Sequence, residues 1–250
     1  MTLLALFMAF STSAEDVPTD PLPLHVEAPQ PEDIDDLTTV RLGVGMLVTP
    51  DFEGSKDYGI YPLPIIQVNN WHKFNLSFRG LSYPLLNFEN DATSEFRKVQ
   101  FRLSPAISPS SSRNSDGNAI FSSRKDNKYL RGLSDVDRGL DVGADVFLRT
   151  GPIATQLVLR QEVAGGHDGF TARVSVGTQI PFSPKTRLGV EIGSTWADSD
   201  YMDAFFSVDR YEAWRSIYRP YDASAGFKDA FVGMRLDYDI TERVGIFSAM

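Results

Sequence analysis

The sequence predicts an all-β fold, a transmembrane antiparallel β-barrel of about twelve strands when complete. Three observations support this prediction. From residue 39 onward, apolar residues occupy every second position in segments of about ten residues, whereas soluble strands usually have about five or six. The polar positions of these segments repeatedly carry full charges of both signs. The connections alternate between tight turns and long loops, as in barrels of the bacterial outer membrane.

The chain begins with a segment that resembles a secretory signal peptide. Residues 3–10 form a short apolar core, and Thr12, Ser13 and Ala14 resemble a cleavage site of small residues. No basic residue precedes the core, so the signal is atypical or the true start lies upstream. A buried helix is the alternative interpretation. We expect residues 1–14 to be removed on export, which leaves Glu15 as the first mature residue.

Residues 15–38 predict an extended periplasmic tether. This segment contains five prolines and eight acidic residues but no Lys or Arg. Proline removes backbone donors, and like charges repel each other, so the segment lacks the means to form a packed core. A plain linker is the favoured interpretation, and a partner-binding segment is the alternative.

Residues 39–250 are assigned to the barrel. In the first strand, Val40, Leu42 and Val44 alternate with Arg41 and Gly43. A soluble sandwich or a lipocalin-like barrel has the same alternation, but the strand length, the charged face and the loop lengths favour a membrane barrel. Strands are expected near residues 39–49, 58–69, 73–79, 81–88, 96–108, 138–149, 153–163, 170–180, 187–197, 225–239 and 243–250.

The strand count carries a further expectation. The expected strands 73–79 and 81–88 are separate only if the chain turns at Gly80. A short helix is expected near residues 210–218. The count is eleven in this sequence, whereas bacterial single-chain barrels have even numbers. We therefore expect a closing strand beyond residue 250, which makes the barrel C-terminally truncated in this chain.

Composition excludes several classes of protein. The chain has no cysteine and therefore no disulfide scaffold, thiolate zinc site or cysteine nucleophile. Its formal net charge of −9 argues against a nucleic-acid partner, because no basic surplus is available to replace phosphate counterions. We expect no cofactor and no resident metal.

The first long connection combines acidic, small and aromatic residues, and it leads into a strand that contains two prolines. Its carboxylates are compatible with a divalent-cation site, but Asp, Gly and Ser are also what a strand connection needs, and this structural interpretation is favoured. The two prolines each delete a backbone donor, which predicts an irregular or bulged strand or a barrel corner. The residues concerned are Asp51, Glu53, Gly54, Ser55, Asp57, Tyr58, Pro62 and Pro64.

A glycine-rich segment contains the histidine with the most conspicuous surroundings. It consists of Gly165, Gly166, His167, Asp168 and Gly169. Histidine and aspartate on a barrel rim are compatible with hydrolysis, but no nucleophile is identifiable beside them, and one imidazole with one carboxylate is too few ligands for a metal. We expect a hairpin loop in which the histidine forms local hydrogen bonds.

Charged residues at polar positions of the strands are expected to line a water-filled lumen, and oppositely charged pairs are expected to narrow it. These residues are Asp145, Arg160, Glu162, Arg173, Glu191, Arg235 and Asp237.

Two further groups of residues are assigned to the ends of the barrel. A basic stretch that includes Arg113 and Arg131 is compatible with contacts to lipopolysaccharide phosphates or with a solvated loop. Aromatic residues near strand ends predict an interfacial girdle rather than a ligand cage. They are Trp71, Tyr83, Trp196, Tyr201, Phe205 and Phe206.

Five motifs in the same order resemble the MipA/OmpV family of outer-membrane proteins. They occupy residues 49–64, 131–136, 165–170, 201–208 and 221–229, so the resemblance covers about residues 40–250. Members of this family normally continue through a further strand that ends in an aromatic residue, and this chain stops before it.

The resemblance implies a function that the residues alone do not give. It implies an outer-membrane location of the Gram-negative type and a non-enzymatic scaffold for peptidoglycan-remodelling enzymes, with a lytic transglycosylase and a murein synthase as partners. The alternative is a small-solute channel or a surface adhesin of the outer membrane. The barrel's outer surface is expected to contact outer-membrane lipid and lipopolysaccharide. An envelope hydrolase is the least favoured alternative.

Overall fold

The computed structural model describes residues 5–11, 38–50, 58–77, 80–90, 94–113, 129–241 and 244–249. Its strands are β1 (Ala5–Ser11), β2 (Thr39–Pro50), β3 (Tyr58–Trp71), β4 (Phe74–Ser77), β5 (Gly80–Ser82), β6 (Leu86–Glu89), β7 (Val99–Pro109), β8 (Leu140–Thr150), β9 (Ile153–Glu162), β10 (Phe170–Ser183), β11 (Thr186–Ala197), β12 (Gly226–Thr241) and β13 (Val244–Ala249). A 3-10 helix, η1 (Glu95–Arg97), and two α-helices, α1 (Ser199–Phe206) and α2 (Arg210–Arg215), complete the described elements. None of these helices is long and apolar enough to cross a membrane.

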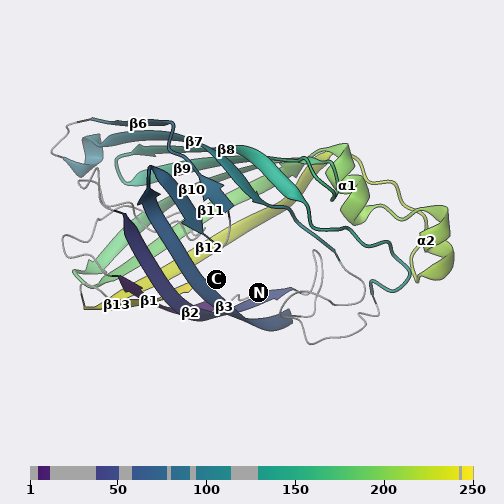
Figure 1. Ribbon diagram of the computed structural model, residues 1–250, viewed down its shortest axis with the longest axis horizontal. Coiled ribbons are helices and arrows are strands. Elements are labelled where there is room, and N and C mark those ends of the chain that lie inside the picture. The colour runs from purple at the N-terminus through teal and green to yellow at the C-terminus, as the bar shows by residue number, and fades with distance from the viewer. Residues whose placement is uncertain are drawn as a thin grey trace.

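All the strands belong to one curved antiparallel sheet, so the predicted all-β fold is confirmed (Figure 1). The hydrogen-bonded order is β5-β4-β3-β2-β1-β13-β12-β11-β10-β9-β8-β7-β6. From β7 to β13, each strand pairs with its neighbour in sequence, as in a meander. The tight turns that make these hairpins are the ones expected from the sequence, such as the turn at Gly151, whose φ is +58°.

β5 and β6, the first and last strands of this order, both pair with β7, which makes the sheet barrel-like. β5 pairs with β7 through Leu81↔Ile107 and Ser82↔Ala106. β6 pairs with the same strand further along, and the N–H of Tyr83 donates to the carbonyl of Pro105 at 3.0 Å between them. β5 and β6 therefore act as one interrupted strand, and twelve strand positions surround the interior.

The sheet is not closed along its whole height. β3 pairs with β4 only at Gln67, Val68 and Trp71, so within the described residues its first half has a ladder partner on one side only, in β2. Pro62 and Pro64 lie in this half. The β2–β3 register runs without a shift from Thr39 to Pro50. The prolines therefore do not lie at a bulge of this ladder, which was one of the structures predicted from the sequence. Proline is tolerated on a strand edge that has no ladder partner, because a donor is not needed there.

The last described strand has a partner on each side, and a strand beyond residue 250 stays a prediction. β13 pairs with β12 and with β1, and β1 also pairs with β2. Residues of the expected signal peptide therefore occupy the position that the odd strand count assigned to a strand beyond residue 250. Whether export removes residues 1–14 is a separate question, and the signal peptide stays a prediction. Residues 12–37, which include nearly all of the expected tether, lie outside the described residues.

The polarity of the sheet is inverted relative to a soluble protein. On β12, the side chains of Val232, Met234 and Leu236 are exposed, whereas Arg235 and Asp237 at the alternate positions are buried. The same division holds around the sheet: outward positions are largely apolar, and Gln67, Gln100, Gln156, Glu162, Glu191 and Thr195 are buried on the inward face. Soluble domains bury apolar side chains and seldom bury unpaired charge.

From β7 to β13, the connections sort by length onto the two ends of the sheet (Figure 1). One end carries the tight turns. η1 also lies there, because Lys98, the residue that follows it, accepts a hydrogen bond at its carbonyl from the N–H of Gly151 in the β8–β9 turn, at 2.7 Å. The other end carries the long loops with α1 and α2. We call these the tight-turn end and the loop end. The predicted separation of short and long connections is thus present, and the predicted turn near Gly80 lies between Ser77 and Gly80.

Candidate binding cavity beneath the loop end

The loop end is covered by an ordered cap, which we define as residues 129–139 and 198–225. Each helix of the cap begins at an aspartate whose side chain accepts a hydrogen bond from the helix backbone. Asp198 accepts from the N–H of Tyr201 at 3.0 Å, and Asp209 forms a reciprocal capping box with Glu212. These caps allow two short helices to form within a segment expected to be a long loop with one short helix.

Arg113 joins the two parts of the cap. Its Nη1 donates to the carbonyl of Phe205 at 2.6 Å and its Nη2 donates to the carbonyl of Ser134 at 2.8 Å. Burial lowers the pKa of Arg113, while the nearby carboxylates of Glu212 and Asp135 raise it. The suggestion that this residue binds lipopolysaccharide phosphates is therefore wrong, because its donors are used inside the cap. Arg131 is exposed on the cap surface, and the remaining basic residues of the stretch lie outside the described residues.

Glu212 supplies the second internal link of the cap. Its carboxylate accepts hydrogen bonds from the N–H of Ser134 at 2.7 Å and from the N–H of Asp209 at 3.0 Å. Burial acts to raise the pKa of Glu212, but these hydrogen bonds outweigh it, and the pKa is lowered overall. The charged carboxylate is thus the form that the cap stabilises.

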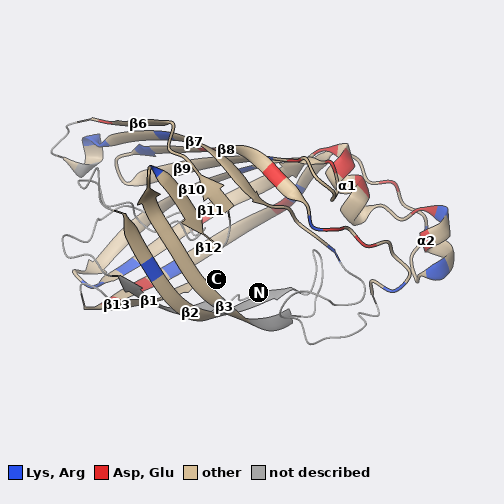
Figure 2. Ribbon diagram, viewed as in Figure 1, with Lys and Arg blue, Asp and Glu red and all other residues tan. Residues whose placement is uncertain are grey.

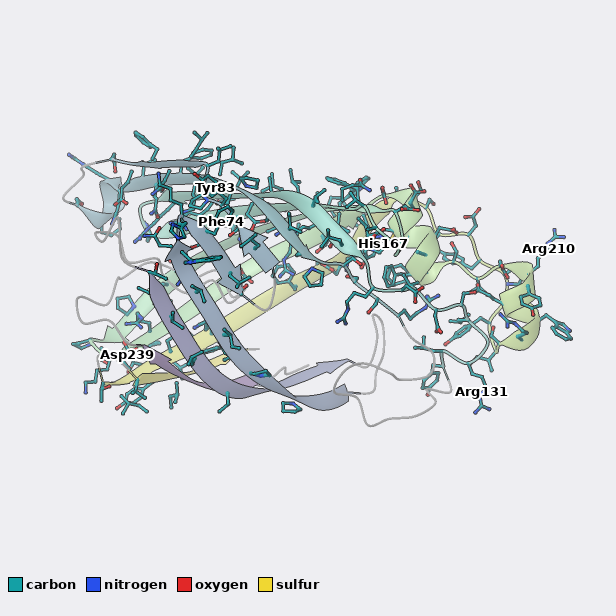
Figure 3. The ribbon with its side chains drawn as sticks, viewed as in Figure 1. Phe74, Tyr83, Arg131, His167, Arg210 and Asp239 are labelled. Carbon is teal, nitrogen blue, oxygen red and sulfur yellow. The ribbon has the colours of Figure 1, made fainter. Side chains whose placement is uncertain are left out.

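The glycine-rich loop between β9 and β10 packs beneath the cap. Nδ1 of His167 accepts from the N–H of Gly169 at 3.0 Å, and the histidine side chain is buried against the rings of Tyr201 and Phe205. The carboxylate of Glu162 accepts from the N–H groups of Ala164 and Asp168, at 2.8 and 2.9 Å. Figure 3 shows His167 at the junction of the strands and α1.

A cavity of about 280 Å³ lies on the inner face of five neighbouring strands, β8 to β12, with His167 and Tyr201 at its cap side. It is lined by Ser111, Asp141, Val158, Arg160, His167, Gly169, Thr171, Arg173, Thr195, Tyr201, Lys228 and Asp229. Three permanent cations and two carboxylates therefore share one small, partly enclosed space. Such a cavity is suited to binding a polar solute rather than an apolar one.

The predicted lumen charges are placed on the inner face as pairs. Nη1 of Arg160 lies 2.7 Å from Oδ1 of Asp145, and Arg235 makes a bidentate contact with Asp237 at 2.7–2.9 Å. Nη2 of Arg173 lies 4.0 Å from Oε1 of Glu191, a loose contact. Glu162, the seventh of these residues, is used by the glycine-rich loop. Figure 2 shows acidic residues on α1 and basic residues at the ends of α2.

The remaining predicted residues are only partly described. Asp51, Glu53, Gly54, Ser55 and Asp57 lie outside the described residues, and Tyr58 begins β3. No group of three His, Cys, Asp or Glu side chains within the described residues lies close enough together to hold a metal ion.

The expected aromatic girdle is only partly correct. Trp71 is exposed near the tight-turn end, as expected, and Tyr83 contacts Phe74 with their ring centroids 5.1 Å apart. Tyr201 and Phe205, in contrast, are buried with Val136 and Ala197 in the core of the cap. They are buried in this core and are not exposed on the outer surface, because α1 folds over the rim.

Three further charged residues, Asp141, Lys228 and Asp229, line the cavity and are not among the residues predicted from the sequence. Asp141 occupies a polar position of its strand, where alternation alone does not distinguish it from its neighbours. Lys228 and Asp229 are adjacent in sequence, and both reach the cavity because the β11–β12 register shifts near Thr195 and Trp196. Strict alternation gives adjacent residues opposite faces, so the sequence carries no signal for this pair.

Comparison with known proteins agrees with the motif resemblance. No curated protein and no solved structure matches the chain. The family model described as MltA-interacting protein MipA matches residues 42–250, which is most of the chain and includes every strand from β3 to β13. The family is named for an interaction and not for a reaction. The chain belongs to the MltA-interacting protein MipA family.

Proposed function

We propose that this protein is an outer-membrane β-barrel that holds a murein-cleaving enzyme at its tight-turn end. The observation that carries the membrane assignment is the inverted polarity of the sheet, with apolar side chains outside and paired charges inside. The partner comes from the family, whose name specifies an interaction with MltA, a lytic transglycosylase. A murein synthase is the second enzyme that the motif resemblance implies.

The inverted polarity has a direct energetic reason. A continuous surface of exposed Val, Leu, Ile and Phe is unfavourable in water but favourable against acyl chains, and the strands satisfy their backbone groups in the sheet. Charged residues on the inner face remain paired and partly hydrated. The same arrangement implies contact with outer-membrane lipid and lipopolysaccharide around the barrel.

The tight-turn end offers an exposed aromatic surface that suits a protein partner. Phe96 in η1 is 81% exposed, and Phe182 near the β10–β11 turn is 66% exposed. Short turns face the periplasm in barrels of this kind, where murein enzymes work. Aromatic side chains are enriched among the residues that dominate protein interfaces.

A pull-down from native envelopes tests the scaffold. We expect tagged protein to retain a lytic transglycosylase, and we expect Phe96→Ser to reduce the amount retained. Trp214→Ser is the matched control, because Trp214 is 82% exposed but lies in α2 at the loop end. Failure of the unaltered protein to retain any murein enzyme after crosslinking overturns the scaffold.

The cavity favours a second candidate function, a small-solute channel. Its mixed charges and its place on the inner face below the cap resemble a polar constriction. Steady ion conductance of the purified protein in a planar bilayer supports this candidate. A barrel that inserts but does not conduct excludes it.

A further inference from the structure

The cavity on strands β8 to β12 contains two charged groups that keep unused hydrogen-bonding capacity among the described residues. These are the guanidinium of Arg173 on β10 and the carboxylate of Asp141 on β8. One strand, β9, separates them. Asp141 is level with Glu162 of β9, whereas Arg173 is level with Val158, four residues further along. Strands two positions apart lie about 10 Å apart and a strand rises about 3.3 Å per residue, so the two backbone positions are roughly 16 Å apart and their side chains enter one shared space from different parts of its wall.

Arg173 is held in place by contacts that leave its N–H donors unused. Its guanidinium lies over the ring of Phe231, 3.9 Å from the ring centroid, and its ion pair with Glu191 is loose, at 4.0 Å. The carboxylate of Asp229 also lies near enough to attract it, without a hydrogen bond between them in the described residues. Within the described part of the chain, Arg173 has no hydrogen bond. A guanidinium stacked on an aromatic ring and presenting five N–H donors is suited to bind a carboxylate or phosphate.

Arg160 provides a comparison within the same cavity. Its guanidinium contacts Asp145 at 2.7 Å and donates to the hydroxyl of Ser108 at 3.2 Å and to the carbonyl of Leu159 at 2.9 Å. Arg160 is therefore committed to the wall of the barrel. Of the two arginines that line the cavity, Arg173 is the one left to meet a solute.

Asp141 presents an unpaired acceptor. Its Oδ1 is buried and has no hydrogen-bond partner among the described residues. Its cross-strand neighbour Glu162 does not compete for the same role, because the Glu162 carboxylate accepts from the backbone of the glycine-rich loop. A buried carboxylate oxygen without a donor is costly, and a bound ammonium group relieves that cost.

We propose that this cavity binds a small, elongated zwitterionic solute whose two charges are separated by several bonds, with Arg173 receiving its anionic group and Asp141 its ammonium group. Thr171 and Thr195, which also line the cavity, offer neutral hydroxyls between the two charged ends. The volume of about 280 Å³ lies at the lower edge of the range of about 300–1,000 Å³ for ligand sites. Opposite charges at two positions of one small site select against solutes that carry only one of them.

Calorimetric titration of the full-length protein in detergent tests this assignment with three probes. 6-Aminohexanoate carries both charges, hexanoate only the carboxylate, and hexylammonium only the amine. We expect 6-aminohexanoate to bind at least about tenfold more tightly than either analogue, because each charged hydrogen bond adds on the order of 1.5–3 kcal/mol.

Two variants assign the ends of the ligand. Arg173→Met is expected to reduce the affinity for 6-aminohexanoate to that for hexylammonium, and Asp141→Asn to that for hexanoate. Gln179→Ala is the matched control, because Gln179 lies on β10 with the same alternation as Arg173 but does not line the cavity. Heat-modifiable migration on a gel confirms that each variant forms the barrel.

The outcomes separate clearly. Equal affinities for 6-aminohexanoate and hexanoate, or binding by neither, overturn the zwitterion site. Variant affinities that match those of the control do the same. The inference does not depend on the murein enzyme, so Arg173→Met is expected to retain that enzyme in the pull-down even when solute binding is lost.

Discussion

His167 and Tyr201 meet edge to face, with their ring centroids 4.8 Å apart and their planes at 73°. One ring comes from the β9–β10 loop and the other from α1, so this contact fixes the cap to the strands. Phe205 extends the contact, because its ring stacks on Tyr201 at 4.6 Å and lies 5.4 Å from His167. The roof of the cavity is therefore an aromatic cluster and not a flexible loop.

Removing Tyr201 is expected to release the cap. Tyr201 is 2% exposed, and replacing a buried aromatic side chain by alanine costs about 3 kcal/mol. We expect Tyr201→Ala to reduce hydrogen-exchange protection of residues 198–208 by about a hundredfold, while the strands keep theirs. Tyr211→Ala is the control, since Tyr211 is on the exposed face of α2. Equal protection in both variants contradicts the fixed roof.

The cap is expected to loosen in acid through Glu212. The folded-state pKa of Glu212 lies below its usual value of 4.5, because the hydrogen bonds from Ser134 and Asp209 outweigh the effect of burial. A depressed carboxyl pKa contributes stability that is fully present above the unfolded value and is lost as the pH falls through the folded value. The contribution is therefore present at neutral pH and lost below about pH 4.5.

Limited proteolysis at a series of pH values measures this effect. We expect cleavage within residues 209–225 to increase as the pH falls below about 4 in the unaltered protein. Glu212→Gln is expected to be cleaved readily at all pH values. An identical pH profile in the variant rules out Glu212 as the titrating group.

The sequence predicts the strands well because one simple rule governs them. Each strand has an apolar outer side and a polar inner side, so a two-residue period persists through strands such as β10 and β12. The observed strands begin and end within a few residues of the expected positions. β1 is the exception, because its apolar residues are equally suited to a signal peptide.

The cap and the cavity are less accessible to this rule. α1 has eight residues, too few for a helical period to stand out, and its aromatic residues look like those of an interfacial girdle. Arg113 and Phe205 are 92 residues apart in sequence, so no local pattern links them. Whether Oδ1 of Asp141 has a hydrogen-bond donor depends on which neighbouring donors already bond to other groups, and only the folded structure provides that information.

The membrane assignment predicts an unusual cost for an exposed substitution. Val232 is 66% exposed near the middle of β12, where a soluble protein tolerates arginine with a cost below about 0.5 kcal/mol. Facing hydrocarbon, the same substitution is expected to destabilise the barrel by about 2–4 kcal/mol. Equilibrium unfolding from lipid vesicles measures the difference.

Phe227→Arg is the matched control, because Phe227 is similarly exposed but lies at the loop end of the same strand. Near the interface the expected cost is only about 0–1 kcal/mol. Equal and small costs at both positions place the apolar surface in water and exclude the membrane barrel.

Export is expected to remove residues 1–14, and this has a consequence for the sheet. If the mature chain begins at Glu15, the segment that forms β1 is absent from the barrel, and the edges of β2 and β13 that it covers need another strand. Mass spectrometry of protein purified from outer membranes measures the mature N-terminus. A mature chain that retains Ala5–Ser11 instead makes β1 a permanent strand and eliminates the cleaved signal peptide. Phe7 and Gly45 are register partners of β1 and β2. Disulfide formation between cysteines introduced by Phe7→Cys and Gly45→Cys therefore distinguishes a β1 that pairs with β2 from an N-terminal segment that is retained but unpaired.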